Sequence, residues 1–197
     1  MPSRETLIQE ILDRELEMFL TVPARHPAAC QSHPEEFRNT RSTQFSVWSE
    51  EALALYLEDL KTARDQGRNL MTLKYARMEN LIPSLHDDPL VENLIDQIVA
   101  VQLEWQRELA CRYPNLIGRG RPLEDGGEAR GVTAFVIYLR GELETYSDNT
   151  LACLYRDVTE ARARGENLTE GIYREMVRNL GYRSIEDAEA RIREGRA

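Results

Sequence analysis

The chain carries two related segments 98 residues apart, and this internal repeat constrains its fold more than any other feature. Residues 67–78 read GRNLMTLKYARM, and residues 165–176 read GENLTEGIYREM. An ungapped alignment of residues 48–78 with residues 146–176 has 11 identical positions out of 31. Residues 7–18 also match residues 94–105 at a spacing of 87, so the second copy contains 11 extra residues. Self-similarity of this kind predicts two copies of one supersecondary unit, with the insertion in an exposed connection.

Both copies have the hydrophobic spacing of helices. Leu7, Ile11 and Leu12 recur at helical intervals within residues 4–20, and residues 91–112 follow the same pattern. The ranges 35–47, 132–145 and 185–195 also favour helices, the last one after the N-cap Ser184, and no strand-like alternation persists. Matched residues mark the remaining boundaries: Ser49 and Ser147 are N-caps, Gly67 and Gly165 end those helices, and Asn69 and Asn167 cap the next ones.

The sequence therefore predicts an all-α protein that is a tandem duplication of a four-helix unit. We expect a first repeat at residues 1–88 and a second at residues 89–197, packed with pseudo-twofold symmetry. The two repeats should form one structural domain, because they would bury one common apolar layer.

Composition excludes several classes of protein. With 34 acidic and 25 basic residues the net charge is −9, and a chain without a long basic run is a poor candidate for nucleic-acid binding. No apolar stretch approaches the roughly 20 residues of a membrane helix, and residues 1–19 lack a signal-peptide pattern. We expect a cytoplasmic protein. Three unclustered cysteines argue against a disulfide framework or a thiolate zinc site.

Polar residues that occur in only one copy indicate where a site lies. Lys74 corresponds to Ile172 and Arg41 to Leu139, and the apolar counterparts suggest that these positions are buried. A buried cation needs a partner or an anionic ligand. Further along, the inserted segment contains GRGRP at residues 118–122, in which two arginines separated by glycine suit a carboxylate or a phosphate.

These positions predict an enzyme that acts on a small anionic metabolite between the repeats, with the reaction type open. The candidate catalytic residues are Lys74, Tyr138 and Glu142, as acid–base groups tuned by burial. The candidate substrate-binding residues are Arg41, Gln44, Arg77, Arg119, Arg121 and Arg140. Charged residues at helical spacing also fit a solvated face, so a non-catalytic helical module that binds a ligand or a protein is the alternative. The oligomeric state stays open.

Metal and thiol chemistry is a second alternative. The chain has no Glu-x-x-His pattern, which a di-iron bundle would need. Glu17 and Glu104 are matched acids that could ligate a metal in an oxidase or oxygenase. Cys30 lies between His26 and His33, which is the pattern of a thiol beside an imidazole but also fits a half-buried loop cysteine. No phosphate loop or dinucleotide fingerprint occurs, so we expect no cofactor.

Several motifs together resemble a known family. They are CQ at residues 30–31, QFSVW at 44–48, GRNLMTLKYARM at 67–78, GRGRP at 118–122 and YLRGELETYS at 138–147. The combination resembles the bacterial domain-of-unknown-function family numbered four-one-two-five, over about residues 8 to 180. The resemblance implies a bacterial, intracellular protein and brings no activity with it. Its motifs include several of the candidate site residues, which supports a shared pocket.

Overall fold

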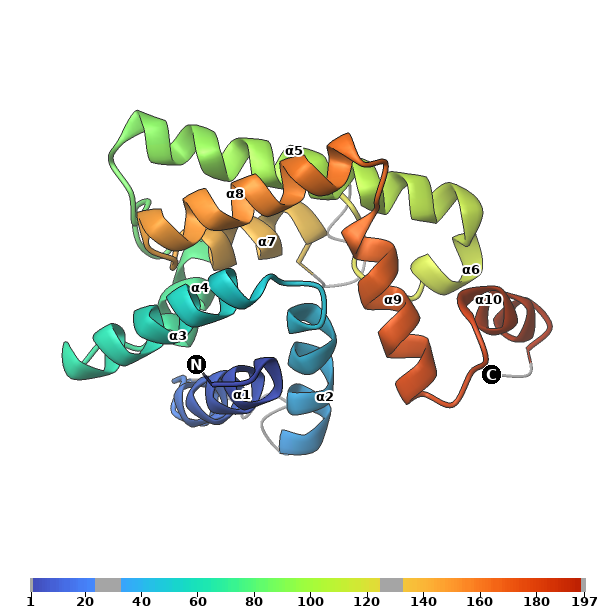
Figure 1. Cartoon of the computed structure of the whole chain (residues 1–197), viewed down its shortest axis with the longest axis horizontal. Helices are drawn as coiled ribbons and strands as arrows, with labels where there is room; N and C mark the ends of the chain where they lie inside the picture. Colours follow the sequence, from blue (N-terminus) through green and yellow to red (C-terminus); the bar gives the residue numbers. More distant parts are fainter. Residues whose placement is uncertain (1, 24–32, 125–132, 196–197) are drawn as a thin grey trace.

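The described part of the chain folds into helices (Figure 1). The structure, a computed structural model, describes residues 2–23, 33–124 and 133–195. Its helices are α1 (Arg4–Leu20), α2 (Pro34–Phe45), α3 (Glu50–Asp65), α4 (Leu70–Met78), α5 (Pro89–Arg112), α6 (Pro114–Ile117), α7 (Phe135–Leu143), α8 (Asp148–Ala163), α9 (Leu168–Asn179) and α10 (Ile185–Arg193). No strand occurs among these residues, so the all-α prediction is confirmed. None of the described helices has the length and apolar character needed to cross a membrane.

The helix boundaries follow the predicted caps. The side chains of Ser49, Ser147, Asn69 and Asn167 each accept a hydrogen bond from the backbone N–H three residues on. Gly67 and Gly165 have φ angles of 66° and 71°, the left-handed conformation that ends a helix without strain on a side chain. The differences are small: α7 spans a shorter range than predicted, and the short helix α6 lies in the inserted segment, where the sequence shows no hydrophobic period.

The helices pack in two sets. α1 packs on α2, α3 and α4, whereas α5 packs on α7, α8 and α9. The sets meet where α3 packs on α8, α4 on α7 and α2 on α9 (Figure 1). One apolar cluster runs through both sets and includes Ile11, Leu53, Ile95 and Leu151, each fully buried. A second, smaller cluster joins the end of α5 to α6, α9 and α10 through residues such as Leu109 and Ile185.

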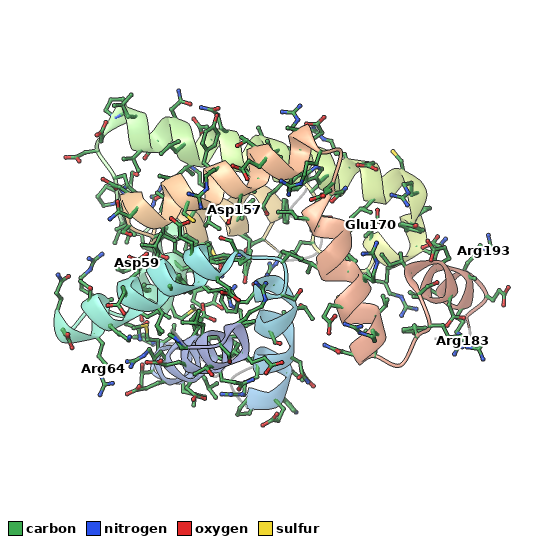
Figure 2. The ribbon with its side chains drawn as sticks, viewed as in Figure 1. Asp59, Arg64, Asp157, Glu170, Arg183 and Arg193 are labelled. Atoms are coloured by element: carbon green, nitrogen blue, oxygen red, sulfur yellow. The ribbon has the colours of Figure 1, made fainter. Side chains whose placement is uncertain are left out.

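Carboxylates on α3 and α8 hold the start of the opposite helix. Ser49 donates from its hydroxyl to Asp157 Oδ2 at 2.5 Å. In the reverse direction, the backbone N–H of Ser147 and the hydroxyl of Thr150 donate to Asp59 Oδ2 at 3.0 and 2.7 Å. Figure 2 labels Asp59 on α3 and Asp157 on α8. A carboxylate beside the positive end of a helix stabilises it, so these contacts fasten the two sets together where α3 meets α8.

Candidate functional site

Four charged side chains meet inside the protein where α1, α2, α4 and α7 converge. Arg41 donates two hydrogen bonds to Glu15, from Nε at 2.7 Å and from Nη2 at 2.5 Å. Its Nη1 lies 2.7 Å from Glu142 Oε1, and the Lys74 ammonium lies 2.8 Å from Glu142 Oε2. The exposed fractions are 0% for Glu15, 3% for Arg41, 2% for Lys74 and 6% for Glu142. We refer to these four residues as the ionic cluster.

Three tyrosines contact the side chains of the ionic cluster. Tyr56 donates to Glu15 at 2.6 Å, and Tyr146 donates to Glu142 at 2.7 Å. Tyr138 lies with its ring 3.7 Å from the Lys74 ammonium, a cation–π contact. Two carboxylates and two cations balance within the cluster, which is the arrangement that makes burial of charge tolerable.

The pKa directions of Glu142 and Lys74 keep both side chains charged near neutral pH. Burial alone would raise the pKa of Glu142, but Arg41 and Lys74 outweigh burial and hold that pKa well below its usual range. Burial would lower the pKa of Lys74, and Glu142 outweighs it, so the Lys74 pKa is raised. Acid–base catalysis is most effective when the pKa of the group lies near the working pH. These directions therefore favour a structural ion network over proton transfer by Lys74 or Glu142.

A glycine allows α7 to approach α4 closely enough for this pairing. A Cβ atom on Gly141 would lie 2.9 Å from Met78 Cγ and 3.2 Å from the Lys74 carbonyl oxygen. The first distance is one that real Cβ atoms essentially never show and the second is tight, so an alanine there would force Met78 and the backbone of α4 to shift. The next residue along α7 is Glu142, whose carboxylate consequently reaches the Lys74 ammonium.

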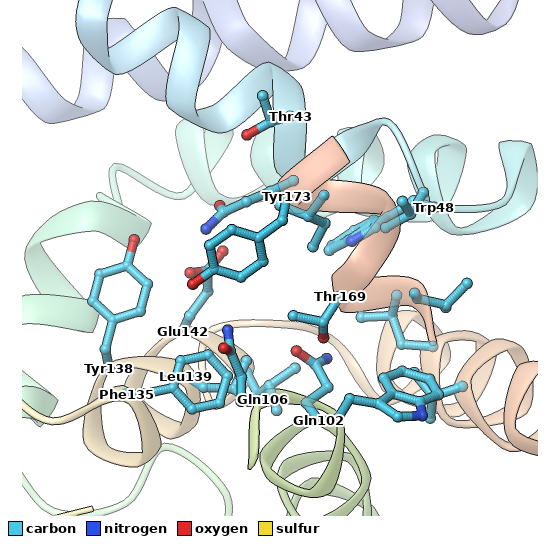
Figure 3. A pocket seen from close by; sticks show the side chains of 18 of the residues that line it. Thr43, Trp48, Gln102, Gln106, Phe135, Tyr138, Leu139, Glu142, Thr169 and Tyr173 are labelled. Atoms are coloured by element: carbon cyan, nitrogen blue, oxygen red, sulfur yellow. The ribbon is translucent and has the colours of Figure 1, made fainter. Parts of the chain in front are cut away.

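A cavity of about 320 Å³ lies beside the ionic cluster, between α2, α5, α7 and α9 (Figure 3). Most of its lining is aromatic or aliphatic, including Trp48, Trp105, Phe135, Leu139 and Ile172. Its uncharged polar lining comprises Thr40, Thr43, Gln44, Gln102, Gln106, Tyr138, Tyr146, Thr169 and Tyr173, and its charged lining comprises Arg121, Glu142 and Asp157. A mainly apolar cavity of this size with a few convergent polar groups is typical of a small-molecule site.

The side chain of Gln106 is the most informative polar group of this cavity. Gln106 is 7% exposed, and its Oε1 atom has no hydrogen-bond partner among the described residues. Figure 3 shows the side chain of Gln106 reaching up from α5 toward the hydroxyl of Tyr173, with the Gln102 side chain beside it and below Thr169. Burial raises the pKa of Tyr173 and outweighs the lowering effect of the neighbouring Gln106 amide. Because a buried amide oxygen without a partner costs about 1–3 kcal/mol, this atom points to a missing hydrogen-bond donor.

The structure brings some of the predicted site residues together. Gln44, Arg121, Tyr138 and Glu142 line the cavity. Arg121 is exposed, stacks its guanidinium 4.4 Å from the Tyr138 ring centre, and donates one hydrogen bond to the Thr133 carbonyl. Arg41 and Lys74 do not line the cavity and instead contact it through Glu142.

The remaining predicted arginines lie elsewhere. Arg77 donates to Glu144 at 2.5 and 3.1 Å and to the Ile82 carbonyl, and Arg140 pairs with Glu144, Glu92 and Asp96. None of these arginines lines the cavity, and Arg119 is exposed and also lies outside its lining. The predicted site residues therefore lie in three places: the cavity with the ionic cluster, a second charge cluster around Glu144, and the exposed Arg119.

The residues of the metal and thiol alternative are not assembled in the described part of the chain. Glu17 and Glu104 are both exposed, and Glu104 pairs with Arg162 at 2.8 Å. Across residues 2–23, 33–124 and 133–195, no group of three or more acidic, histidine or cysteine side chains could hold a metal ion. Cys30 and His26 lie outside the described residues.

The uncharged polar residues of α5 and α9 that line the cavity were not predicted from the sequence. Gln102, Gln106, Thr169 and Tyr173 all line it, and none was a candidate. A signal for Gln106 was present, since it occupies an apolar position of the helical pattern in residues 91–112 and corresponds to Phe19 in the repeat alignment. A polar residue at a core position is informative in the same way as a buried cation.

The comparison with known families gives a single assignment. The family described as Protein of unknown function (DUF4125) matches residues 5–190. The chain belongs to this family. No curated protein and no solved structure matches the chain. The resemblance inferred from the sequence motifs is thereby confirmed, and the description of the family assigns no activity.

Proposed function

We propose that this DUF4125 protein is a binding protein for a small, largely apolar molecule, which it holds in the cavity between α2, α5, α7 and α9. The observation that carries the proposal is the buried Gln106 oxygen without a partner, beside a 320 Å³ cavity with an aromatic lining. Proteins satisfy almost all buried polar groups, and a bound molecule with a hydrogen-bond donor would satisfy this one.

The charges of the ionic cluster favour binding over acid–base catalysis. Arg41 and Lys74 are neutralised by Glu15 and Glu142, so neither is available to an anionic substrate. Among the described residues that line the cavity, Arg121 is the one cation, and it is exposed at the edge. An enzyme for a small anionic metabolite would therefore have to hold its substrate at Arg121 rather than inside the cavity.

Hydrogen bonds at equivalent positions of the two aligned segments support a tandem duplication with pseudo-twofold symmetry. Asn69 donates to the Met18 carbonyl at 2.8 Å, and Asn167 donates to the Trp105 carbonyl at 3.3 Å, which are corresponding pairs in the repeat alignment. The contacts of Asp157 and Asp59 with the opposite serines form a second corresponding pair. Contacts that are shared at equivalent positions are expected if one ancestral helical unit was copied.

Under this duplication, the cavity is the counterpart of the ionic cluster. The alignment pairs charged Glu15 with Gln102, Arg41 with Leu139, and Lys74 with Ile172, and it also pairs Met71 with Thr169. Each of these residues of the second copy lines the cavity. The first copy fills its interior with long, paired charged side chains, and the second carries shorter or uncharged ones there. Replacement of several long side chains leaves space that packing would otherwise fill.

A fragment screen by saturation-transfer NMR tests the proposal, with monocyclic and bicyclic aromatic compounds as the panel. We expect binders whose signals disappear when the cavity is filled by Leu139→Phe or by Thr169→Met, the residue that the first copy carries. The matched control is Leu180→Phe, because Leu180 is 67% exposed and lies outside the cavity lining. A screen without binders, or binders that both cavity-filling variants leave unaffected, would show that the cavity is not a binding site.

A further inference from the structure

The chemistry of the cavity specifies the class of ligand, an inference that rests on the proposed function. We propose that the cavity selects an uncharged ring compound whose hydroxyl or cyclic-amide group donates a hydrogen bond to Gln106 and accepts one from Tyr173. The geometry behind this is the juxtaposition of the unpartnered Gln106 oxygen with the Tyr173 hydroxyl at the same wall of the cavity (Figure 3).

Gln106 and Tyr173 together offer a ligand one hydrogen-bond acceptor and one donor. The Gln106 amide lies close enough to the Tyr173 hydroxyl to exert a lowering effect on the pKa of that tyrosine. When the amide nitrogen of Gln106 donates to the tyrosine oxygen, the tyrosine proton remains for a ligand, and the Gln106 oxygen remains as an acceptor. A phenolic hydroxyl presents the complementary donor and acceptor on one oxygen, and a lactam presents them on its N–H and C=O groups. A hydrocarbon or an ether would leave the Gln106 oxygen without a donor.

The charge of the lining favours an uncharged ligand. An anion inside the cavity would face the carboxylate of Glu142, whose two neighbouring cations, Arg41 and Lys74, are already paired. A cation would gain little from Glu142, because that carboxylate already accepts from Arg41, Lys74 and Tyr146. The second carboxylate of the lining, Asp157, is likewise engaged, since it accepts from Ser49 and lies 3.6 Å from the Arg156 guanidinium. Burial of an unpaired charge is costly, so both ions are disfavoured relative to a neutral molecule.

The residues that differ between the two aligned segments are consistent with selection of an uncharged ligand. The alignment exchanges an acid for an amide at Glu15/Gln102 and a cation for an aliphatic residue at Arg41/Leu139 and Lys74/Ile172. The cavity side therefore lacks the counterparts of these charges while keeping hydrogen-bonding groups. A site that rejects charged molecules and pairs with neutral ones gains specificity from both effects.

The aromatic lining favours a ring. Trp48, Trp105, Phe135 and Tyr138 contribute flat apolar surfaces, and aromatic rings pack on one another in offset or edge-on arrangements. The cavity of about 320 Å³ is large enough for a bicyclic molecule. Trp48 and Trp105 are the two tryptophans of the chain, so its intrinsic fluorescence reports directly on the cavity.

Three compounds of similar shape separate the contribution of the hydrogen bond from that of the ligand's charge: naphthol, its methyl ether and naphthoate. Their binding to the full chain is measured by calorimetry and by the change in tryptophan emission. We expect naphthol to bind about tenfold more tightly than the methyl ether and than naphthoate, the factor that corresponds to one hydrogen bond of about 1.4 kcal/mol. In Gln106→Leu, which keeps the volume but removes the acceptor, the preference over the methyl ether should disappear.

The outcomes distinguish the two proposals. If none of the compounds binds, or if Leu139→Phe and Thr169→Met leave their binding unchanged, the cavity is not the site and the proposed function fails. If all three bind equally to the unmodified protein in a way that Leu139→Phe abolishes, the proposed function stands and the ligand class is wrong. Tightest binding of naphthoate, or a naphthol preference that survives in a folded Gln106→Leu protein, would also overturn the ligand class. The comparison within the unmodified protein does not depend on whether Gln106→Leu folds.

Discussion

Removal of one charge from the ionic cluster should destabilise the fold strongly. Glu142→Gln keeps the size of the side chain and an oxygen that can accept from Tyr146, but it leaves Arg41 and Lys74 opposite Glu15 alone. All four charges are at least nine-tenths buried, so water cannot solvate the surplus cation. Loss of one partner from a buried ion pair costs about 3–5 kcal/mol. We expect a loss of unfolding free energy in that range at neutral pH.

Urea denaturation measures this loss. With an m-value of about 2–3 kcal/mol per M, the midpoint should fall by about 1 to 2.5 M. The matched control is Glu104→Gln, since Glu104 makes one exposed ion pair with Arg162, and exposed pairs contribute little. We expect the midpoint of the control to equal that of the unmodified protein.

The pH dependence gives a second check with a definite sign. The pKa of Glu142 is depressed in the folded protein, so its contribution is complete above the unfolded pKa of about 4.3 and is lost as the pH falls below that value. The stability difference between the unmodified protein and Glu142→Gln should stay constant from neutral pH to about pH 5.5 and shrink below about pH 4. If Glu142→Gln shifts the midpoint no more than Glu104→Gln, or if the difference grows in acid, the cluster is not ionised as described.

Three further predictions follow from individual contacts. Lys74→Met combined with Glu142→Gln leaves a balanced buried pair, so urea midpoints should show the double variant more stable than the sum of the single losses, by about 1–3 kcal/mol. Gly141→Ala should destabilise by about 1–3 kcal/mol in thermal or urea unfolding, although alanine favours helices, because its Cβ would collide with α4. A stable Gly141→Ala protein would contradict the close approach of α4 and α7. The pKa of Glu186 is lowered to about 2, first by the hydrogen bond from Tyr113 and then by that from Ser184, so Tyr113→Phe should raise that pKa part of the way to its usual value of about 4.3 in an NMR titration; an unchanged titration would exclude the Tyr113 hydrogen bond as a cause.

The helices could be predicted from the sequence because their signals are local. Ser49 and Asn69 cap helices with their own side chains, and Gly67 ends one with its left-handed backbone, all within a few residues along the chain. The predicted ranges 4–20 and 91–112 nearly coincide with α1 and α5. The short helix α6 escaped prediction, because one turn is too short to show a hydrophobic period.

The candidate site could be predicted only in part. The unequal exchange of Lys74 for Ile172 correctly indicated a buried cation, and Tyr138 and Glu142 do lie beside it. The sequence could not assign each cation to a carboxylate. Arg77 also differs between the aligned segments, where it corresponds to Glu175, yet it pairs with Glu144 in a different cluster.

The sequence by itself determined the helical composition, the positions of the caps and the similarity between residues 48–78 and residues 146–176. Each depends on interactions between residues that are close along the chain or on an alignment of the chain with itself. The tertiary structure decided that Arg41 and Lys74 share Glu142, and that Gln106 and Tyr173 face a common cavity. These arrangements depend on how far α7 approaches α4 and how α9 crosses α2, and such distances are set by the packing of side chains more than 60 residues apart in sequence.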